Sequence, residues 1–555
     1  MKRLLVLFLL LMITACDVPT DTPPQEINCD IYPTHKDCKE DEEPIVDNGD
    51  AYPGSGGYEN LGYGSEDVYT ARDLVPDDCD HLDNIGMWQP VWCEEFEYTG
   101  LPDDDKWNYD VGGHGWGNGE LQYYTNKDED NAYVSNGVLT ITTIRETFDS
   151  NAYTSARIVT RDKGDWLYGK IQVRAKVPEG LGTWPAIWML PTDWEYGGWP
   201  TSGEIDIMEY VGYQPNTIHG TIHTGKYNHS LGTQLGRSRT VATAEEEFHV
   251  YEMEWEVGVI RLYVDGILYV TFDYDPEDNT DVDSFQAWPF DKQFHLLINT
   301  AFGGAWGGAQ GIDPEIMPVE FVIDYVRVYQ KDYAGMDETA PNAVTNLSAL
   351  EIKSDKLYVA WDKAIDDVMV KEYHIYVDDV LTASTTVNGH LLDGLQPSTS
   401  YDIKVIAEDF AGHLSIETTV TFTTTAPPTI NNRIEAEDYD NMSGVQTENT
   451  QDTGGGLNVG WVDTDDYMEY VLQVTESGNY QIEFRIASES NGAHLEIYQD
   501  DVLIGTMDSP ATGSWQTWDS FYSSVFELTP GTYTFKLVAT DSGFNINYFD
   551  FRKVS

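Results

Sequence analysis

The chain has 555 residues, enough for three or four domains, and a formal net charge of −64 from 95 acidic and 31 basic residues. This charge argues against a nucleic-acid partner, because no basic patch is available to neutralise phosphates. Repulsion also disfavours a heavily sulfated or uronate polymer. The 35 Tyr, 16 Trp, 48 Gly and 24 Pro residues favour β-sandwiches with tight turns. We therefore expect an all-β protein with a neutral polysaccharide as its partner.

The N-terminus has the pattern of an export signal. Residues 1–3 end in two basic side chains, and the apolar run at residues 4–13 is too short to span a membrane. Residues 13–16 resemble a bacterial lipobox, which implies acylation of Cys16. The alternative is cleavage near Ala15, with Cys16 incidental. We expect residues 1–16 to direct export, and the mature protein to be held by a lipid anchor on a membrane of the bacterial cell envelope or at the cell surface.

Residues 17–86 are acidic, rich in Pro and Gly, and poor in apolar periodicity, which predicts a linker. It would hold the rest of the chain away from a membrane surface. An exported chain meets oxidising conditions, so the cysteines after Cys16 are expected to form disulfides. Three pairings are possible, and the pairing of sequence neighbours, Cys29–Cys38 and Cys79–Cys93, is favoured.

Residues 87–331 contain short alternating segments separated by Gly and Asp, which predicts one large two-sheet sandwich. Within it, residues 203–211 alternate apolar and acidic side chains, so Glu204 and Asp206 share one strand face. A β-bulge at residues 207–208 would turn Glu209 to the same face.

Three carboxylates on one face repel each other, so some should have pKa values well above their reference values. One ionised and one protonated carboxyl group are what a retaining glycosidase needs. The alternative is a solvated acidic strand face. Given 95 acidic residues in 555, this spacing arises by chance in roughly one window in 200, so the spacing alone does not decide.

Further motifs of this region resemble glycoside hydrolase family 16, and within it the bacterial laminarinase-type endo-β-1,3-glucanases. They lie at residues 116–124, 184–189, 199–209, 219–224, 288–291 and 303–308. The resemblance implies a concanavalin-like β-jelly-roll with an open cleft. It also implies Glu204 as the nucleophile, Glu209 as the general acid/base, and Asp206 between them tuning both.

The resemblance also implies substrate-binding residues. His223 would hydrogen-bond into the carboxylate cluster, unless it is a structural histidine. Tryptophans can stack on the apolar face of a glucosyl ring, although core packing is the common alternative, above all for Trp188. The candidates are Trp116, Asn118, Glu120, Trp184, Trp199, His223 and Trp306. Glu95 and Asp324 match carboxylate positions of a structural calcium in the family.

Residues 338–426 resemble a fibronectin type III domain through Trp361, Tyr373 and residues 395–401, where Tyr401 has a tyrosine-corner setting. Nothing in this segment suggests chemistry. We expect it to act as a spacer.

Residues 432–555 resemble carbohydrate-binding module family 6, another β-sandwich. The resemblance implies an aromatic pair around a sugar, here Trp461 and Trp515 with Trp518 as a rival, helped by an asparagine. Asn545 and Asn547 alternate onto one face, so either could serve. The expected calcium ligands are Glu435, Glu437 and Asp550, whose hard carboxylate oxygens suit that ion.

The sequence thus predicts an endo-acting, retaining hydrolase of laminarin-like β-1,3-glucan, monomeric, with no catalytic cofactor. A mixed-linkage β-glucanase or an agarase on the same scaffold is the first alternative. A non-catalytic glycan-binding lipoprotein is the second.

Overall fold

The structure is a computed structural model that describes residue 79 and residues 81–554. Strands dominate this part of the chain. Its helices are a single turn long: α1 (Ser284–Ala287), α2 (Tyr333–Met336) and the 3-10 turns η4 (Pro276–Asp278) and η5 (Pro314–Ile316). None of the described helices is long and apolar enough to cross a membrane. The predicted signal peptide, Cys16 and the Cys29–Cys38 pair lie outside the described residues.

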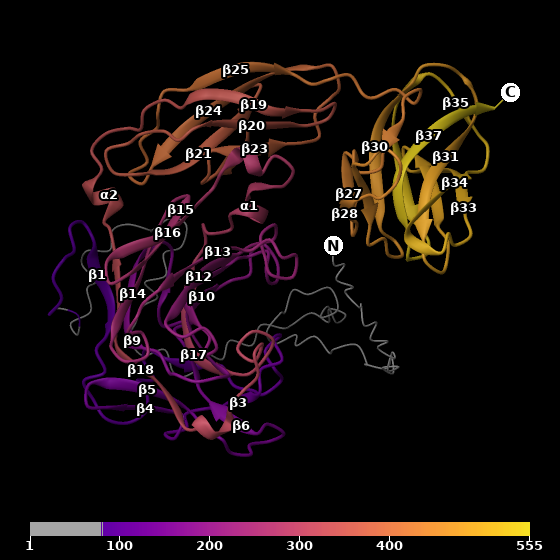
Figure 1. Cartoon of the computed structure of the whole chain (residues 1–555). Helices are drawn as coiled ribbons and strands as arrows, with labels where there is room; N and C mark the ends of the chain where they lie inside the picture. Colours follow the sequence, from indigo (N-terminus) through magenta and orange to yellow (C-terminus); the bar gives the residue numbers. More distant parts are fainter. Residues whose placement is uncertain (1–78, 80, 555) are drawn as a thin grey trace, which may run out of the picture.

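Three β-sandwiches follow each other along the chain, which confirms the all-β prediction (Figure 1). The first sandwich packs two eight-stranded sheets face to face. One sheet has the order β16-β15-β14-β9-β18-β5-β4, with β1 also paired to β18. Its strands are β1 (Gln89–Glu94), β4 (Ala132–Ser135), β5 (Val138–Thr143), β9 (Gly169–Lys176), β14 (His249–Glu256), β15 (Val259–Val264), β16 (Ile267–Asp273) and β18 (Val319–Gln330).

The other sheet has the order β13-β12-β11-β10-β17-β7-β2, with β8 paired to β17. Its strands are β2 (Asn108–Tyr109), β7 (Arg157–Val159), β8 (Asp165–Trp166), β10 (Thr183–Pro191), β11 (Glu204–Tyr210), β12 (Thr217–His223), β13 (Leu235–Thr240) and β17 (Phe294–Phe302). A short parallel pair completes this sandwich: β3 (Gln122–Tyr124) and β6 (Tyr153–Ser155).

The core of the first sandwich lies between its two sheets. Alternate residues of β9 and β15 enter it, as expected for strands with one face buried. Trp255 is fully buried there and packs edge-on against Phe294 and Tyr168. The predicted Cys79–Cys93 disulfide is confirmed, and Cys79 is itself buried. The first sandwich therefore includes residues that the sequence assigned to the linker.

The second sandwich is smaller and has sheets of three and four strands. They are β19 (Thr345–Ile352), β20 (Leu357–Asp362) and β23 (Gly389–Leu392), and then β21 (Val370–Val377), β22 (Val380–Thr385), β24 (Ser400–Asp409) and β25 (Thr418–Thr423). Trp361 and Tyr373 meet edge-on in its core. The hydroxyl of Tyr401 accepts a hydrogen bond of 2.7 Å from the Gln396 amide, in agreement with the predicted tyrosine corner.

The second sandwich packs directly against the first. Phe410 stacks on Tyr333 with ring centroids 5.0 Å apart, and the hydroxyls of Tyr274 and Tyr358 share a buried hydrogen bond. Val387 of the second sandwich belongs to the apolar core cluster of the first. Figure 1 shows α2 at this junction. The segment predicted as a spacer is therefore joined to the first sandwich by a buried interface.

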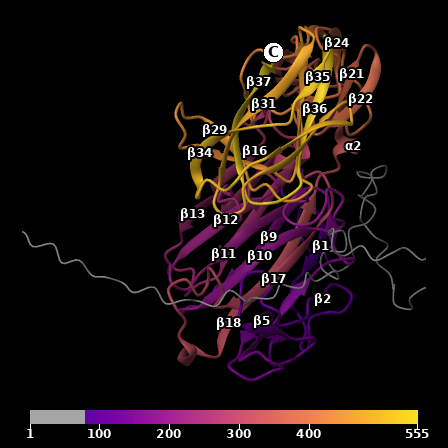
Figure 2. The same cartoon turned by 90° about the vertical axis from the view of Figure 1, so that its right-hand side faces the viewer.

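The third sandwich has sheets of seven and five strands. The first holds β26 (Ile434–Glu435), β28 (Gln446–Asn449), β29 (Leu457–Gly460), β31 (Gly478–Ser488), β34 (Ser514–Tyr522), β35 (Phe526–Leu528) and β37 (Asn545–Val554). The second holds β27 (Asn441–Ser443), β30 (Tyr467–Val474), β32 (His494–Gln499), β33 (Val502–Asp508) and β36 (Gly531–Ala539). Figure 2 shows both smaller sandwiches toward the same end of the first.

Candidate active site

The three acidic residues of β11 lie on one face of their sheet because the strand carries a bulge. Along β12, Thr221 pairs with Asp206 and His219 pairs with Glu209. Two steps on β12 therefore match three on β11, which confirms the predicted bulge. Its two residues, Ile207 and Met208, both enter the core of the first sandwich. Glu204, Asp206 and Glu209 are consequently turned to the opposite face.

Two tryptophans donate hydrogen bonds to the two outer carboxylates. Nε1 of Trp199 lies 2.7 Å from Oε2 of Glu204. Nε1 of Trp184, on the neighbouring strand β10, lies 3.1 Å from Oε1 of Glu209. Both tryptophans were predicted as platforms for sugar rings, and the structure shows that they also hold the carboxylates. A fixed N–H donor orients a carboxylate and favours its ionised form.

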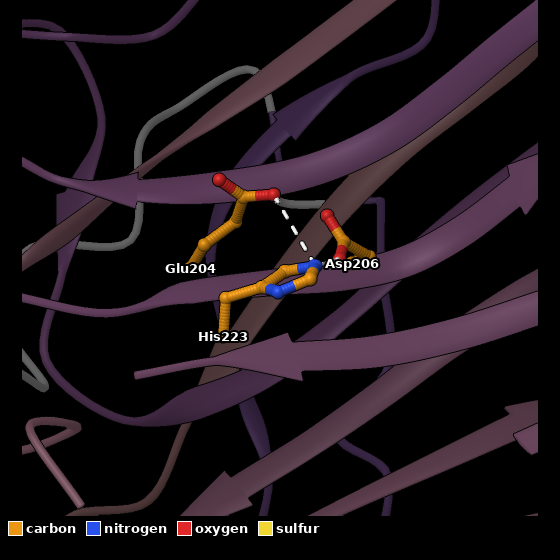
Figure 3. A group of neighbouring side chains, drawn as sticks. All are labelled: Glu204, Asp206 and His223. Carbon is orange, nitrogen blue, oxygen red and sulfur yellow. Dashed lines mark ion pairs between the residues drawn. The ribbon is translucent and has the colours of Figure 1, made fainter. Parts of the chain in front are cut away.

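Asp206 is buried between these carboxylates, opposite His223 of β12 (Figure 3). Nε2 of His223 lies 3.4 Å from Oδ2 of Asp206 and 3.9 Å from Oε1 of Glu204. Neither contact has hydrogen-bond geometry, and Oδ2 of Asp206 has no hydrogen-bond partner. The predicted hydrogen bond from His223 is therefore wrong in this detail. The histidine instead places a titratable ring beside both acids.

Burial and mutual repulsion shift the pKa values of two carboxyl groups in this acidic cluster. Burial raises the pKa of Glu209 well above its usual range, and the charges of Asp206 and Glu204 raise it further. Burial and the charge of Glu204 likewise raise the pKa of Asp206. Like charges at close range cannot all ionise, so burial and these charges favour the protonated forms of Glu209 and Asp206. The cluster can therefore supply an acid beside a nucleophile.

A polar network on the same side of the sheet holds Glu120. Its carboxylate accepts hydrogen bonds from Nδ2 of Asn118 at 3.2 Å, Nε2 of Gln122 at 2.7 Å and the hydroxyl of Tyr124 at 3.2 Å. Nδ2 of Asn299, on β17, donates in turn to the Tyr124 hydroxyl at 2.9 Å. Asn118 and Glu120 are thus brought together as one preorganised hydrogen-bonding surface, with both Glu120 oxygens already engaged.

The remaining predicted tryptophans lie to the sides of the carboxylates. Trp306 meets the Trp184 ring edge-on at 5.5 Å and the His219 ring at 5.1 Å. The guanidinium group of Arg157 lies 4.6 Å from the centre of the Trp116 ring and equally far from that of Trp188. The indole N–H of Trp188 donates a hydrogen bond of 2.7 Å to Oδ1 of Asn299, so this ring has a structural role.

Sequence reasoning missed three residues of this site: Arg157, His229 and Asn299. Arg157 and Asn299 could have been found, because each stands beside apolar residues in a buried strand, where a polar side chain requires a partner. His229 packs against Trp199 at 4.8 Å and His223 at 5.3 Å, but it comes from a loop with no sequence signal.

The two carboxylates expected to hold calcium in the first sandwich have arginine partners. Both oxygens of Glu95 accept hydrogen bonds from Arg327, at 2.7 and 2.8 Å. Asp324 pairs with Arg174. These guanidinium groups take the oxygen lone pairs that an ion would need, so this pair does not fit a calcium site.

The predicted sugar-binding residues of the third sandwich gather near one edge. Trp461 is 55% exposed and Trp515 is 43% exposed. The Gly543 amide donates to the Val462 carbonyl beside Trp461, and a Cβ at Gly543 would lie 3.6 Å from the Trp515 ring. Trp461 and Trp515 therefore flank one short segment. Two exposed aromatic rings so placed can hold a sugar ring, whereas Trp518 is half-buried and donates to Gln516.

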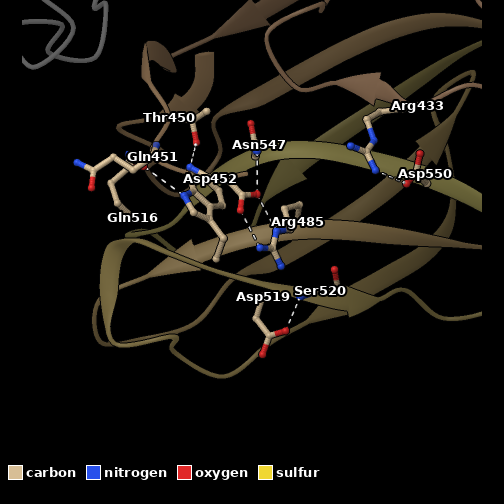
Figure 4. Close-up of polar contacts among 11 residues, drawn as sticks. Arg433, Thr450, Gln451, Asp452, Arg485, Gln516, Asp519, Ser520, Asn547 and Asp550 are labelled. Atoms are coloured by element: carbon tan, nitrogen blue, oxygen red, sulfur yellow. Dashed lines mark hydrogen bonds and ion pairs between the residues drawn. The ribbon is translucent and has the colours of Figure 1, made fainter. Parts of the chain in front are cut away.

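The structure separates the two candidate asparagines. Nδ2 of Asn545 donates to the Trp515 carbonyl at 2.9 Å, so this side chain adjoins the aromatic pair. Nδ2 of Asn547 instead donates to Asp452, which accepts two hydrogen bonds from Arg485 at 2.7 and 2.8 Å (Figure 4). This arginine holds the pKa of Asp452 at about 2. Asn547 thus belongs to a fixed ionic network.

The calcium ligands predicted in the third sandwich fit only in part. Oε2 of Glu437 is buried and has no hydrogen-bond partner. Burial raises the pKa of both Glu437 and Glu435, and the charge of Glu435 adds to the rise at Glu437. A hard cation would satisfy this pair. Asp550 instead accepts hydrogen bonds from Arg433 at 3.4 Å (Figure 4) and from Arg552 at 3.0 Å.

Three family models match the chain in the order of its sandwiches. Residues 119–327 match the glycosyl hydrolases family 16, residues 342–422 the fibronectin type III domain, and residues 435–553 the carbohydrate binding module (family 6).

Two curated relatives are similar to somewhat less than half of the chain. A beta-glucanase of Rhodothermus marinus is 54% identical over 253 residues, which are 45% of this chain and 88% of that protein. A glucan endo-1,3-beta-glucosidase of Cryptopygus antarcticus is 37% identical, over 41% of this chain and 86% of that protein. The solved structure of the laminarinase from Rhodothermus marinus is 55% identical and has a TM-score of 0.43, covering 44% of this chain and 98% of that one.

The carboxylates of β11 lie within the segment that matches the family model. The aligned residues of the Rhodothermus marinus beta-glucanase are 54% identical and cover 88% of that protein. The chain therefore belongs to glycosyl hydrolases family 16, and it is a glycoside hydrolase that also carries a fibronectin type III domain and a family 6 carbohydrate-binding module.

Proposed function

We propose that this protein is an endo-acting, retaining hydrolase of laminarin-like β-1,3-glucan. One observation carries the proposal: Glu204 and Glu209 lie on the same face of β11, each with an indole donor, and burial favours a proton on Glu209. A nucleophile and a protonated acid on one face are the two groups that retention requires. The two relatives described above are a beta-glucanase and a glucan endo-1,3-beta-glucosidase, which supports a β-glucan as the substrate.

In the first step the carboxylic acid of Glu209 gives its proton to the glycosidic oxygen. The carboxylate of Glu204 attacks the anomeric carbon, the bond from that carbon to the glycosidic oxygen breaks, and a glycosyl ester forms on Glu204. In the second step the Glu209 carboxylate takes a proton from water. As that proton leaves, the water oxygen attacks the anomeric carbon and the ester bond to Glu204 breaks, so Glu204 is again a carboxylate and Glu209 is again protonated.

Asp206 and the tryptophans prepare these groups. Asp206 is buried beside Glu204, and a proton shared between them would limit the charge of the cluster before the ester forms. Trp199 holds Glu204 by its N–H and is half-exposed, so its ring can also contact a glucosyl unit. In the third sandwich, Trp461, Trp515 and Asn545 would bind the polymer.

The third sandwich would also hold a calcium ion through Glu435 and Glu437, where it would stabilise the fold without taking part in the reaction. At the N-terminus, acylation of Cys16 would anchor the exported protein to a membrane. Replacing Cys16 with Ser should move the protein from the membrane fraction to the soluble fraction. Unchanged membrane retention would contradict the anchor and leave the hydrolase proposal intact.

Activity is tested by reducing-sugar release from laminarin, lichenan, agarose and κ-carrageenan side by side. We expect laminarin to be cut well ahead of the others into short oligosaccharides, with the β-anomer as the first product in NMR spectra. Glu204→Gln and Glu209→Gln should each abolish turnover. Glu315→Gln is the control, because this exposed glutamate of the same sandwich pairs only with Arg145 in the described structure. Activity confined to a galactan would overturn the substrate, and a first product of the α-anomer would overturn the mechanism.

A further inference from the structure

Four aspartates meet where the first and second sandwiches join. Asp337 directly follows α2, Asp366 and Asp367 lie in the loop between β20 and β21, and Asp409 ends β24. One carboxylate oxygen from each of Asp337, Asp366 and Asp367 lies within 4.8 Å of the others. Asp337 and Asp409 form a second such group with the ring of His413. The chain thus brings four acids together from three separate segments.

Several oxygens of this cluster are buried without partners. The Asp337 side chain is fully buried, and neither of its carboxylate oxygens has a hydrogen-bond partner. Oδ1 of Asp366 is also buried and unpartnered, although its other oxygen accepts hydrogen bonds from the Val368 and Met369 amides. A buried carboxylate costs several kcal/mol unless a charge or a hydrogen bond compensates it. The unsatisfied oxygens of Asp337 and Asp366, two carboxylates that lie close together, therefore favour the binding of a cation.

The protein supplies little positive charge of its own here. Within residues 79 and 81–554, no lysine or arginine forms an ion pair with any of the four aspartates. His413 lies 3.0 Å from Oδ2 of Asp409 and 3.8 Å from Oδ1 of Asp337, and its side chain is 43% exposed. One histidine cannot balance four acids.

We propose that this junction binds a calcium ion through Asp337, Asp366 and Asp367, whereas the oxygens of Asp409 accept hydrogen bonds from Ala411 and His413. Ca²⁺ takes six to eight oxygen ligands at about 2.3–2.6 Å in flexible geometry, so oxygens around one ion lie roughly 3–5 Å apart. The carboxylate oxygens of Asp337, Asp366 and Asp367 already have this spacing. Mg²⁺ requires a tighter, near-octahedral arrangement and retains its water, which an all-carboxylate cluster of this spread suits less well.

The ion would fasten the second sandwich to the first. Asp337 belongs to the segment that leaves the first sandwich, and the other two ligands belong to the second. Phe410, next to Asp409, stacks on Tyr333 of α2 at 5.0 Å. The ion would therefore stabilise the same junction as this aromatic contact, one through polar and the other through apolar side chains. Removal of calcium should weaken the contact between the first and second sandwiches without changing the acidic cluster of β11.

The test uses the full chain, freed of metal with EGTA, in isothermal titration with Ca²⁺ and in thermal unfolding. Glu437→Gln serves as the common background, because it removes the calcium site expected in the third sandwich. In that background Ca²⁺ should still bind and should raise the unfolding temperature by about 3 °C or more. Asp337→Asn and Asp367→Asn should each weaken this binding at least tenfold. Glu338→Gln, an exposed neighbour outside the cluster, should titrate like the background.

Two further outcomes decide the matter. In EGTA, Asp337→Asn should be at least as stable as its background, because it removes a buried uncompensated charge, and it should lose this advantage in calcium. If Asp337→Asn does not fold, the exposed position Asp367 supplies the answer alone. Absence of calcium binding in the Glu437→Gln background, or equal binding by Asp367→Asn, would overturn the proposal.

Discussion

The hydrogen bond from Trp184 to Glu209 offers a sharp test of how the acid is tuned. Nε1 of Trp184 donates to Oε1 of Glu209 at 3.1 Å. This donor stabilises the ionised carboxylate and so lowers the pKa of Glu209, against the larger opposite effects of burial and of the charges of Asp206 and Glu204. In Trp184→Phe the ring is kept and the donor is lost. The pKa of Glu209 should then rise.

The size of the effect follows from the value of such a bond. A hydrogen bond to a charged group contributes about 1.5 kcal/mol or more, and 1.36 kcal/mol corresponds to one pH unit. The alkaline limb of the kcat/KM profile reports the loss of the proton from the free enzyme's acid. In Trp184→Phe we therefore expect this limb to move upward by about one pH unit, while the acidic limb stays in place.

The assay is the initial rate of laminarin hydrolysis at low substrate concentration across the pH range. Trp188→Phe is the matched control, because Trp188 lies on the same strand but donates to the neutral amide oxygen of Asn299. Its alkaline limb should not move. An unshifted limb in Trp184→Phe, or an equal shift in both variants, would refute the assignment of Glu209 as the titrating acid.

Three other predictions concern the rest of the chain. Trp461→Ala should weaken laminarin binding about tenfold in affinity gels. It should leave the hydrolysis of short oligosaccharides unchanged, because this exposed ring lies outside the first sandwich. A fall in oligosaccharide hydrolysis would contradict this prediction. Phe410→Ala should lower the free energy of unfolding by about 1–2 kcal/mol in urea titrations, since it removes the stack on Tyr333; an unchanged midpoint would show that this stack does not hold the junction. Arg485 holds the pKa of Asp452 at about 2, below its unfolded value, so their pairing stabilises the fold above pH ~4 and is lost as the pH falls toward 2. Arg485→Met should remove this pH-dependent part of the stability, and an unaltered acid-unfolding curve would argue against it.

Much of the active strand could be predicted from the sequence. Successive side chains of a strand face opposite sides, so the alternation indicates the strand and the shared face of Glu204 and Asp206. The bulge that turns Glu209 to this face was a hypothesis, and the strand register confirms it. The Cys79–Cys93 disulfide followed in the same way from export and from short sequence separation. In each case the informative residues are close together in the chain, and local geometry is enough to relate them.

Other features depend on contacts between distant segments. Trp184 reaches Glu209 because β10 pairs with β11, and a tryptophan in an apolar run gives no sign of the carboxylate that it will meet. For the same reason the sequence could not show that Asp550 and Glu95 would be taken by arginines.

The junction of the first two sandwiches is the clearest case. Asp337, Asp366 and Asp409 are ordinary acidic residues in a chain with 95 of them. They can be recognised as a cluster only in the folded protein, where they lie close together and away from water. The sequence by itself determined the strands, the carboxylate-bearing face and the order of the three sandwiches, because these follow from periodicity and local motifs. The tertiary structure alone decided which polar groups are paired and which are buried without a partner, because burial depends on every segment that packs around a side chain.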